Sequence, residues 1–136
     1  MKNVLVDMSA TIIHHGHIRL LKKASQIGSV TIALTIDQEI LKYKGYYPEL
    51  KFQERKEILE SIKYVDKVIP SPWKLDLAFF KSTGADFLIH GDDNKNDIPQ
   101  KYLKLYKRTE GISSSIIRDK VVKVIAQRNS LNDKNL

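Results

Sequence analysis

Short apolar runs alternate with segments of helical periodicity along this 136-residue chain, and this alternation limits the folds that it can adopt. Consecutive apolar residues are typical of strands that a parallel sheet buries on both faces. Such runs predict strands near residues 4–6, 30–35, 65–69, 87–90 and 103–107. Apolar residues spaced three and four apart predict helices over about 17–26, from about 52, over 75–81 and over 113–127. Residues 38–49 lack clean periodicity and predict a loop.

This order of elements predicts an α/β fold with right-handed crossovers between neighbouring parallel strands. The expected architecture is a single Rossmann-like, doubly wound, mostly parallel five-stranded sheet flanked by helices. In the second predicted helix, Ile58, Leu59 and Ile62 are expected to face inward. The domain is expected to span 1–127, followed by a polar and frayed tail over 128–136.

Composition excludes several classes of site. The chain has no cysteine, which removes disulfides, a thiolate nucleophile and cysteine-based metal centres. Its 23 basic and 16 acidic residues fit a small anionic substrate, a nucleic acid or a merely solvated basic surface. The basic residues are dispersed and the aromatic residues form no stacking platform, so a nucleic-acid partner is not expected. Without a signal-peptide pattern or a membrane-spanning apolar run, the expectation is a cytoplasmic protein with no membrane partner.

Three of the four histidines cluster at the predicted turn from the first strand into the first helix, as His14, His15 and His17 around Gly16. A helix N-terminus at this place attracts anions through its dipole and its unpaired N–H groups. His14 and His17 share a helical face, and Gly16 permits close approach of a ligand. We interpret the cluster as a phosphate site. Ordinary surface histidines are one alternative; a metal site with Asp92 as third ligand is another, but no spaced ligand set supports it.

A second segment with phosphate donors follows the last predicted strand. Arg108 ends that strand, Gly111 breaks it, and Ser113 and Ser114 begin the last helix, with Arg118 one turn further on. Their hydroxyls and the free N–H groups of the first turn form an anion cradle, although a plain serine cap would look the same. The chain has no nucleophile elbow and no glycine-rich P-loop. These donors without a covalent nucleophile favour direct phosphoryl or nucleotidyl displacement.

Together these segments resemble the cytidylyltransferase family, particularly the glycerol-3-phosphate cytidylyltransferases, within the wider HxGH nucleotidyltransferase superfamily. The resemblance runs from Lys2 to about Val122 and includes the HxGH signature at residues 14–17, an RTEGIS signature at 108–113 and a GDD turn at 91–93. It implies a nucleotidylyl transferase fold. It also implies transfer of CMP from CTP to a small phosphorylated alcohol or phosphonate, with release of pyrophosphate.

The resemblance assigns roles to particular residues. The implied catalytic residues, which contact the CTP phosphates, are His14, His17, Lys44 and Arg108. The implied nucleotide-binding residues are Met8, Ser9, Ala10, Gly16, Asp92, Thr109, Ile112, Ser113, Ser114 and Arg118. Positions implied to line the site or contact the second substrate are Thr11, Arg55, Lys63 and Trp73. By its sequence context alone, Trp73 is better interpreted as a packing residue. The protein itself is expected to hold no metal ion, and Mg²⁺ is expected to bind on the CTP triphosphate.

The chain also departs from the family pattern. Met8, Ser9, Ala10 and Thr11 stand where the family has glycine, threonine, phenylalanine and aspartate, and Lys63 replaces an arginine. The altered segment looks like the variant of cytidylyltransferases attached to phosphonate pathways, so the second substrate stays open. The segment 112–118 also resembles an adenylyltransferase motif. Alternatives are therefore an ATP-dependent adenylyltransferase or a non-catalytic nucleotide-binding module. By analogy with the family, a homodimer is expected.

Overall fold

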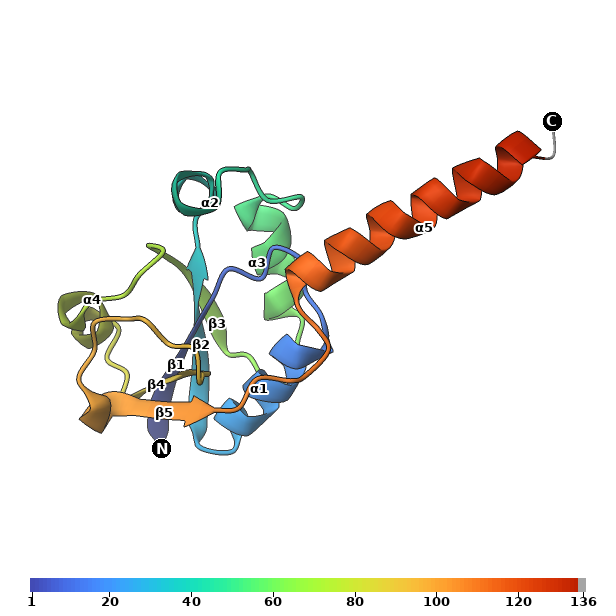
Figure 1. The fold of residues 1–136 in the computed structure, drawn as a ribbon. Coiled ribbons are helices and arrows are strands. Elements are labelled where there is room, and N and C mark those ends of the chain that lie inside the picture. Colours follow the sequence, from blue (N-terminus) through green and yellow to red (C-terminus); the bar gives the residue numbers. More distant parts are fainter. Residues whose placement is uncertain (135–136) are drawn as a thin grey trace.

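Five strands form one sheet in the order β3-β2-β1-β4-β5, and every pairing is parallel (Figure 1). The computed structural model describes residues 1–134. The strands are β1 (Lys2–Met8), β2 (Gly28–Thr35), β3 (Lys67–Ser71), β4 (Phe87–Gly91) and β5 (Leu103–Tyr106). The predicted five-stranded α/β sheet is confirmed, and it is wholly rather than mostly parallel. Pro70 lies inside β3 because an edge strand tolerates the missing N–H.

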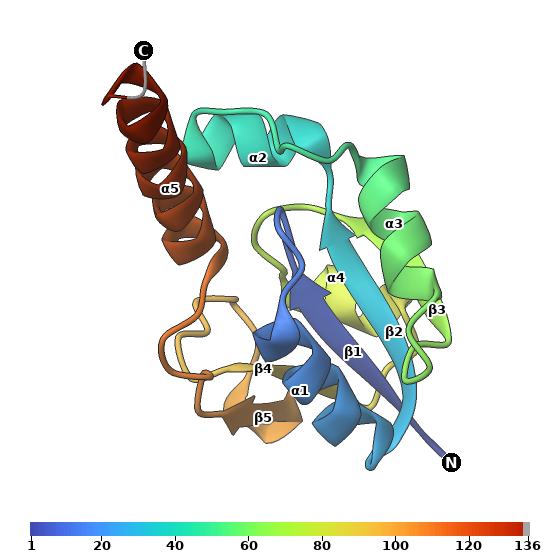
Figure 2. The ribbon, with the colours of Figure 1, turned by 90° about the vertical axis from the view of Figure 1, so that its right-hand side faces the viewer.

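Helices cover both faces of this sheet. The helices are α1 (His15–Ser25), α2 (Asp37–Lys44), α3 (Phe52–Glu60), α4 (Leu77–Ser82) and α5 (Ser114–Lys134), with a 3₁₀ turn at Gln100–Tyr102. Figure 2 shows α1 and α3 in front of the sheet and α4 behind it. The chain thus winds to opposite sides of β1, and the strand order reverses between β1 and β4. Ligands of such sheets bind outside the carboxyl ends of the strands at this switch point.

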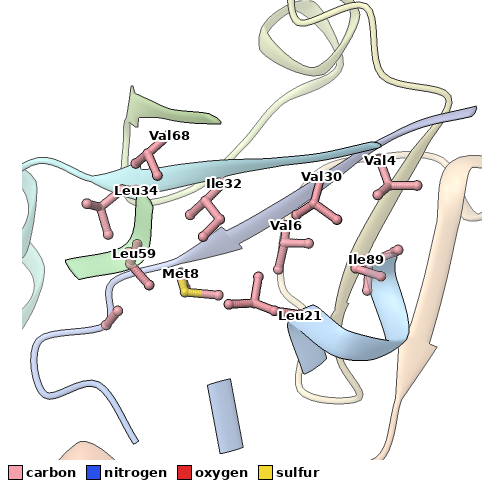
Figure 3. Packing of buried hydrophobic residues seen from close by; sticks show 12 residues of the cluster. Val4, Val6, Met8, Leu21, Val30, Ile32, Leu34, Leu59, Val68 and Ile89 are labelled. Carbon is pink, nitrogen blue, oxygen red and sulfur yellow. The ribbon is translucent and has the colours of Figure 1, made fainter. Parts of the chain in front are cut away.

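Alternate residues of the central strand pack into two separate cores. Val4, Val6 and Met8 of β1 pack with Leu21 of α1 in the larger core, which Figure 3 shows from close by. Leu5 points to the other face and joins the core that α4 covers. Each fully buried aliphatic side chain of this size contributes about 1.5–3 kcal/mol. The two cores fix the sheet and therefore the edge at which its polar residues gather.

Three local expectations from the sequence are wrong. The segment predicted as a loop contains α2, whose acidic first turn and basic last turn suit the helix dipole although only Ile40 is buried. Ile58 is 43% exposed, whereas Leu59 is buried as predicted. The tail predicted to fray from Arg128 continues α5 as far as Lys134. Residues 135–136 lie outside the described part.

Helix α5 projects from the body of the protein, as Figures 1 and 2 show. It begins beside the carboxyl ends of the strands and carries apolar side chains that are half exposed or more, among them Val121, Val122 and Leu131. Within residues 1–134, none of the helices is long and apolar enough to cross a membrane.

Candidate nucleotide site

A cavity of about 790 Å³ lies at the carboxyl edge of the sheet, beside the switch point. It collects most of the residues that the sequence singles out: Met8, Ser9, Thr11, His14, Gly16, His17, Lys44, Trp73, Arg108, Thr109, Ile112, Ser113, Ser114 and Arg118. Ala10, Arg55, Lys63 and Asp92 are the predicted residues that do not line it. The two segments predicted to hold phosphate, far apart in the chain, therefore face one space.

The histidine turn is held by reciprocal hydrogen bonds. The Gly16 N–H donates to His14 Nδ1 at 3.1 Å, and the His14 N–H donates to His17 Nδ1 at 3.1 Å. This is a capping box built from imidazoles, and the two rings lie 3.9 Å apart. Because each Nδ1 accepts a hydrogen bond, the proton of each neutral ring is assigned to Nε2, which leaves two N–H donors for an anion.

Gly16 is required inside this turn. A Cβ at this position would lie 2.9 Å from His14 Cε1 and 3.4 Å from Ile112 Cγ2. The glycine therefore lets the His14 ring and Ile112, which comes from the RTEGIS segment, approach the same stretch of backbone.

Both site histidines are neutral at pH 7. Burial, followed by the charges of His14 and Arg108, lowers the pKa of His17 to about 3. Burial, His15 and Arg108 also lower the pKa of His14. The two rings therefore act as hydrogen-bond donors rather than as cations, and the positive charge nearby comes from arginine and lysine.

The first turn of α5 is attached to the histidine turn by serine. The Ser114 hydroxyl accepts from the Ile12 N–H at 3.3 Å and donates to the Ile12 carbonyl at 3.0 Å. The Ser113 hydroxyl accepts from the Ile116 N–H at 3.1 Å, which is the predicted N-cap. Two segments about 100 residues apart in sequence are thus held in register at the cavity wall.

Arg118 and Thr11 are in direct contact. Arg118 Nη2 donates to the Thr11 hydroxyl at 2.6 Å, and Nε donates to the Glu49 carboxylate at 2.7 Å. The guanidinium also lies 4.9 Å from the centre of the Tyr46 ring. Glu49 keeps the pKa of Arg118 above its usual value despite some burial, and Arg118 keeps the pKa of Glu49 below its own. Arg118 thus joins α5 to the loop between α2 and α3 at the cavity wall.

Lys44 lies next to an aromatic stack that lines the cavity. Tyr43 and Trp73 are parallel within 14°, with ring centres 5.6 Å apart. The Lys44 ammonium lies 5.5 Å from the centre of the Trp73 ring. Trp73 therefore packs against a helix, as its sequence context indicates, and also lines the cavity.

Arg55 requires a correction. Its side chain is fully buried beneath the site and does not line the cavity. It donates to Asp37 at 2.6 Å, to the Ser9 carbonyl at 2.6 Å and to the Leu50 carbonyl at 3.0 Å. Arg55 thus anchors the backbone of the altered segment 8–11 to α2, and the helical pattern alone could not separate this role from a ligand contact.

The other three displaced residues have simple explanations. Ala10 is buried with a φ of 44°, so it bends the backbone between Ser9 and Thr11 instead of facing the cavity. Lys63 comes after the end of α3, and its ammonium lies 5.2 Å from the centre of the Tyr64 ring. Asp92 is exposed, and the next residue, Asp93, lines the cavity in its place.

The sequence interpretation missed several polar residues of the cavity, including a connected group of Asp7, His90 and Asn96. Asp7, His90 and Asn96 all line the cavity, and Asp7 accepts from Asn96 at 2.8 Å. The signal for Asp7 and His90 was present, because each follows an apolar run at the end of a predicted strand. Asn96 lies in an irregular loop and gave no signal. Among the described residues, no group of three or more His, Cys, Asp or Glu side chains is arranged to hold a metal ion.

A doubly wound sheet with imidazoles, arginines and a helix N-terminus around one cavity defines an α/β protein that binds a phosphorylated ligand. The family model described as cytidylyltransferase-like matches residues 9–108, and the chain belongs to this family.

Similar proteins agree with this membership. A glycerol-3-phosphate cytidylyltransferase of Staphylococcus aureus is 34% identical over 129 residues, covering 89% of this chain and 96% of that protein. A probable ethanolamine-phosphate cytidylyltransferase of Schizosaccharomyces pombe is 32% identical over 122 residues, and this chain covers only 33% of its length. A lipopolysaccharide core biosynthesis protein from Thermoplasma volcanium shares the fold, with a TM-score of 0.62 and 23% identity over 71% of this chain and 80% of that one.

Proposed function

We propose that this protein is a cytidylyltransferase that transfers CMP from CTP to a small phosphorylated alcohol or phosphonate. One observation carries the proposal: the HxGH turn and the RTEGIS segment face a single cavity and are joined by the Ser114–Ile12 hydrogen bonds. The near full-length match to the Staphylococcus aureus enzyme supports the same activity.

The proposed reaction is a direct displacement. A phosphate oxygen of the acceptor attacks the α-phosphorus of CTP and forms a new P–O bond. The bond from that phosphorus to the oxygen bridging to the β-phosphorus breaks, and pyrophosphate leaves with the electron pair. CTP enters as its magnesium complex, in which the metal ion neutralises part of the triphosphate charge.

The chain's own residues would stabilise the charge of this transition state. The Nε2–H groups of His14 and His17 donate to the phosphate oxygens, and Lys44 and Arg108 supply positive charge. Ser113, Ser114 and Arg118 would hold the β- and γ-phosphates at the N-terminus of α5. Met8, Ser9, Gly16, Thr109 and Ile112 would shape the wall around the nucleotide.

The lining of the cavity favours an acceptor without a cationic group. Of the described residues that line it, Asp7 and Asp93 are the carboxylates, and both are already engaged by His90 and Arg108. Lys44 and Lys74 line the side that holds Trp73. An ammonium group there would meet like charges, whereas glycerol phosphate would not. Glycerol phosphate is therefore the acceptor we propose first.

Pyrophosphate release tests this function. The purified protein is given MgCTP or MgATP with glycerol-3-phosphate, ethanolamine phosphate or a small phosphonate. Release is expected with MgCTP, fastest with glycerol-3-phosphate. Release with MgATP alone would make the protein an adenylyltransferase. If no pair gives pyrophosphate although a nucleotide binds, the protein is a binding module and the proposal is wrong.

The proposal includes a homodimer. Helix α5 leaves the body of the protein with half-exposed Val121 and Ile125 and more exposed Val122 and Leu131, which a second copy could cover. Light scattering at micromolar concentration is expected to give twice the mass of the chain. Replacing Val122 and Leu131 together by glutamate should give the monomer mass. A monomeric wild-type protein would contradict this part of the proposal.

A further inference from the structure

Asp7 and His90 form a pair at the switch point of the sheet. Val6 of β1 lies opposite Ile89 of β4, so the next residues, Asp7 and His90, are neighbours at the cavity edge. His90 Nδ1 lies 2.5 Å from Asp7 Oδ1, and the side chains are 22% and 11% exposed. The second oxygen of Asp7 accepts from Asn96 at 2.8 Å. Asp7 is thus fixed on both oxygens and holds His90 in one orientation.

Two further charged contacts connect the Asp7–His90 pair to Arg108. His90 Nε2 lies 3.6 Å from Asp93 Oδ1, and Asp93 Oδ2 accepts from Arg108 Nη1 at 2.5 Å. A Cβ at Gly91 would lie 2.8 Å from Asp93 Oδ1 and 3.0 Å from Arg108 Cγ. The missing side chain at Gly91 therefore allows Asp93 and Arg108 to meet beside His90.

An exposed ion pair alone would hold Arg108 poorly. The side chains of Arg108 and Asp93 are 52% and 47% exposed, and pairs at such exposure contribute only about 0–1 kcal/mol. A partly buried imidazolium 3.6 Å away would change this, because, held by Asp7, it attracts Asp93 before the ligand arrives and lowers the entropy cost of orienting the guanidinium. The hydrogen bond of Arg108 to Asp93 uses Nη1, so its other N–H groups remain available for a phosphate.

We propose that His90 is a positioning residue which, held by Asp7, fixes the Asp93–Arg108 pair at the cavity wall and thereby strengthens the binding of the CTP phosphates. This inference rests on the proposed function, because it assumes that Arg108 meets a nucleotide phosphate. His90 itself touches no reacting atom in this account.

The protonation of His90 gives the inference a pH signature. Burial opposes its charge, but the hydrogen bond to Asp7 and the charges of Asp7 and Asp93 outweigh burial and the repulsion of Arg108, so its pKa is raised above 6.5. The charged groups facing it are Asp7 from β1, Asp93 after β4 and Arg108 after β5. Below its pKa the two carboxylates are balanced by His90 and Arg108. Above it His90 no longer attracts Asp93, and the Asp93–Arg108 pair loses its link to Asp7.

The titration of His14 and His17 is separated in pH from that of His90. Their pKa values are lowered below 6.5, whereas the pKa of His90 is raised above it, so His90 is the one of the three that loses its proton mainly above pH 6.5. Loss of CTP affinity in that range is therefore assigned to His90.

Calorimetry of MgCTP binding tests the inference without any acceptor present. The wild-type protein should bind MgCTP about tenfold more weakly after His90 loses its proton. His90→Gln should show the weaker affinity throughout, with no dependence on pH from about 6.5 to about 9. His15→Gln is the matched control, because His15 is exposed and outside the cavity lining, and it should behave like the wild type.

Asp93→Asn provides a second variant on an exposed loop, where folding is not at risk. It should also weaken MgCTP binding and remove most of its pH dependence, because the link to Arg108 is lost. A wild-type affinity independent of pH, or wild-type binding by both variants, would overturn the inference, as would failure of the wild type to bind MgCTP. Binding with the expected pH dependence but no pyrophosphate release would refute the proposed function alone.

Discussion

At the scale of single residues, the site depends on two histidines that the fold keeps neutral. An imidazolium would attract phosphate more strongly, but burial and Arg108 disfavour it, and the pKa of His17 is lowered to about 3. A neutral donor already aimed by its own capping box needs no reorganisation when negative charge develops on the phosphates. Arg108 and Lys44 remain as the sources of charge.

His17→Ala is expected to lower kcat/KM for CTP by about 10²–10³-fold, which is the effect of removing one preorganised donor. The loss should appear mainly in kcat, because the donor acts on charge that develops in the transition state. Steady-state kinetics with glycerol-3-phosphate measures it, and His15→Ala serves as the control on the adjacent exposed ring. An unchanged kcat would refute the role of His17.

Arg55 is expected to matter for stability rather than for binding. Arg55→Ala leaves Asp37 and the carbonyls of Ser9 and Leu50 without their partner, which should cost about 3–5 kcal/mol of unfolding free energy. Lys56→Ala on the same helix breaks only the pair with Glu60 and should cost less than about 1 kcal/mol. Urea unfolding compares the two. A small cost for Arg55→Ala combined with a large rise in KM would support a ligand contact instead.

The predictions from sequence succeed or fail at this scale for physical reasons. His14, His17 and Arg108 were predictable because each lies where a strand, a turn and a helix N-terminus meet. Arg55 was misplaced because a buried arginine and an arginine that lines a site occupy the same positions in a helical pattern. Asp92 and Asp93 are adjacent, and only the backbone path after β4 decides which one faces the cavity.

At the scale of elements, α5 and the loop between α2 and α3 are joined by one arginine. Arg118 donates to Glu49 and to Thr11, the residue that stands where the family has aspartate. The Glu49 carboxylate accepts hydrogen bonds from the same guanidinium that is proposed to bind the CTP triphosphate. If Arg118 holds the triphosphate as proposed, nucleotide binding would compete with Glu49 for this guanidinium.

Glu49→Gln should lower KM for CTP about two- to fivefold, because an exposed ion pair of this kind contributes about 0.5–1 kcal/mol. The same change should destabilise the fold by less than about 1 kcal/mol. Glu57→Gln, at an exposed position of α3, is the charge-matched control and should leave KM unchanged. A higher KM in Glu49→Gln would mean that Glu49 supports the site instead of competing for Arg118.

The helices and strands were predictable where burial imposes a regular pattern of apolar residues on the sequence. Strands β1, β2 and β4 are covered on both faces, so their apolar runs were clear. Helix α2 was missed because it buries only Ile40 and therefore shows no apolar stripe. The length of α5 was underestimated because residues 128–134 are polar apart from Leu131, and a single apolar residue gives no periodicity to mark the helix.

At the scale of the whole molecule, the switch point between β1 and β4 explains why residues from four strand ends share one cavity. The order of the strands could not be obtained from the sequence, since periodicity reports burial but not which strand lies beside which. The excess of basic residues fits the expected pair of anionic substrates, and several of these residues line the cavity, among them Lys44, Lys74, Arg108 and Arg118.

The stability of the fold should depend on pH through His17. Its folded pKa of about 3 lies below the ordinary value of 6.5, so the unfolded chain binds more protons between these values. The contribution of His17 to the free energy of unfolding is complete above pH 6.5 and is lost as the pH falls toward 3, and it amounts to about 5 kcal/mol. His17→Gln keeps an acceptor for the capping box but does not titrate, so its stability should fall less steeply in acid. Urea unfolding at pH 7 and at about pH 4.5 measures this fall in the free energy of unfolding. An equal fall in the wild type and in His17→Gln would contradict the prediction.

The central claim is that one cavity brings CTP and a phosphorylated acceptor together for direct displacement at the α-phosphorus. Mass spectrometry of the products formed from MgCTP and glycerol phosphate with ¹⁸O in its phosphate group tests this most directly. All of the label is expected to be retained in a product that joins the acceptor phosphate to CMP, with unlabelled pyrophosphate beside it. Free CMP as the only nucleotide product, or label in the pyrophosphate, would contradict the account.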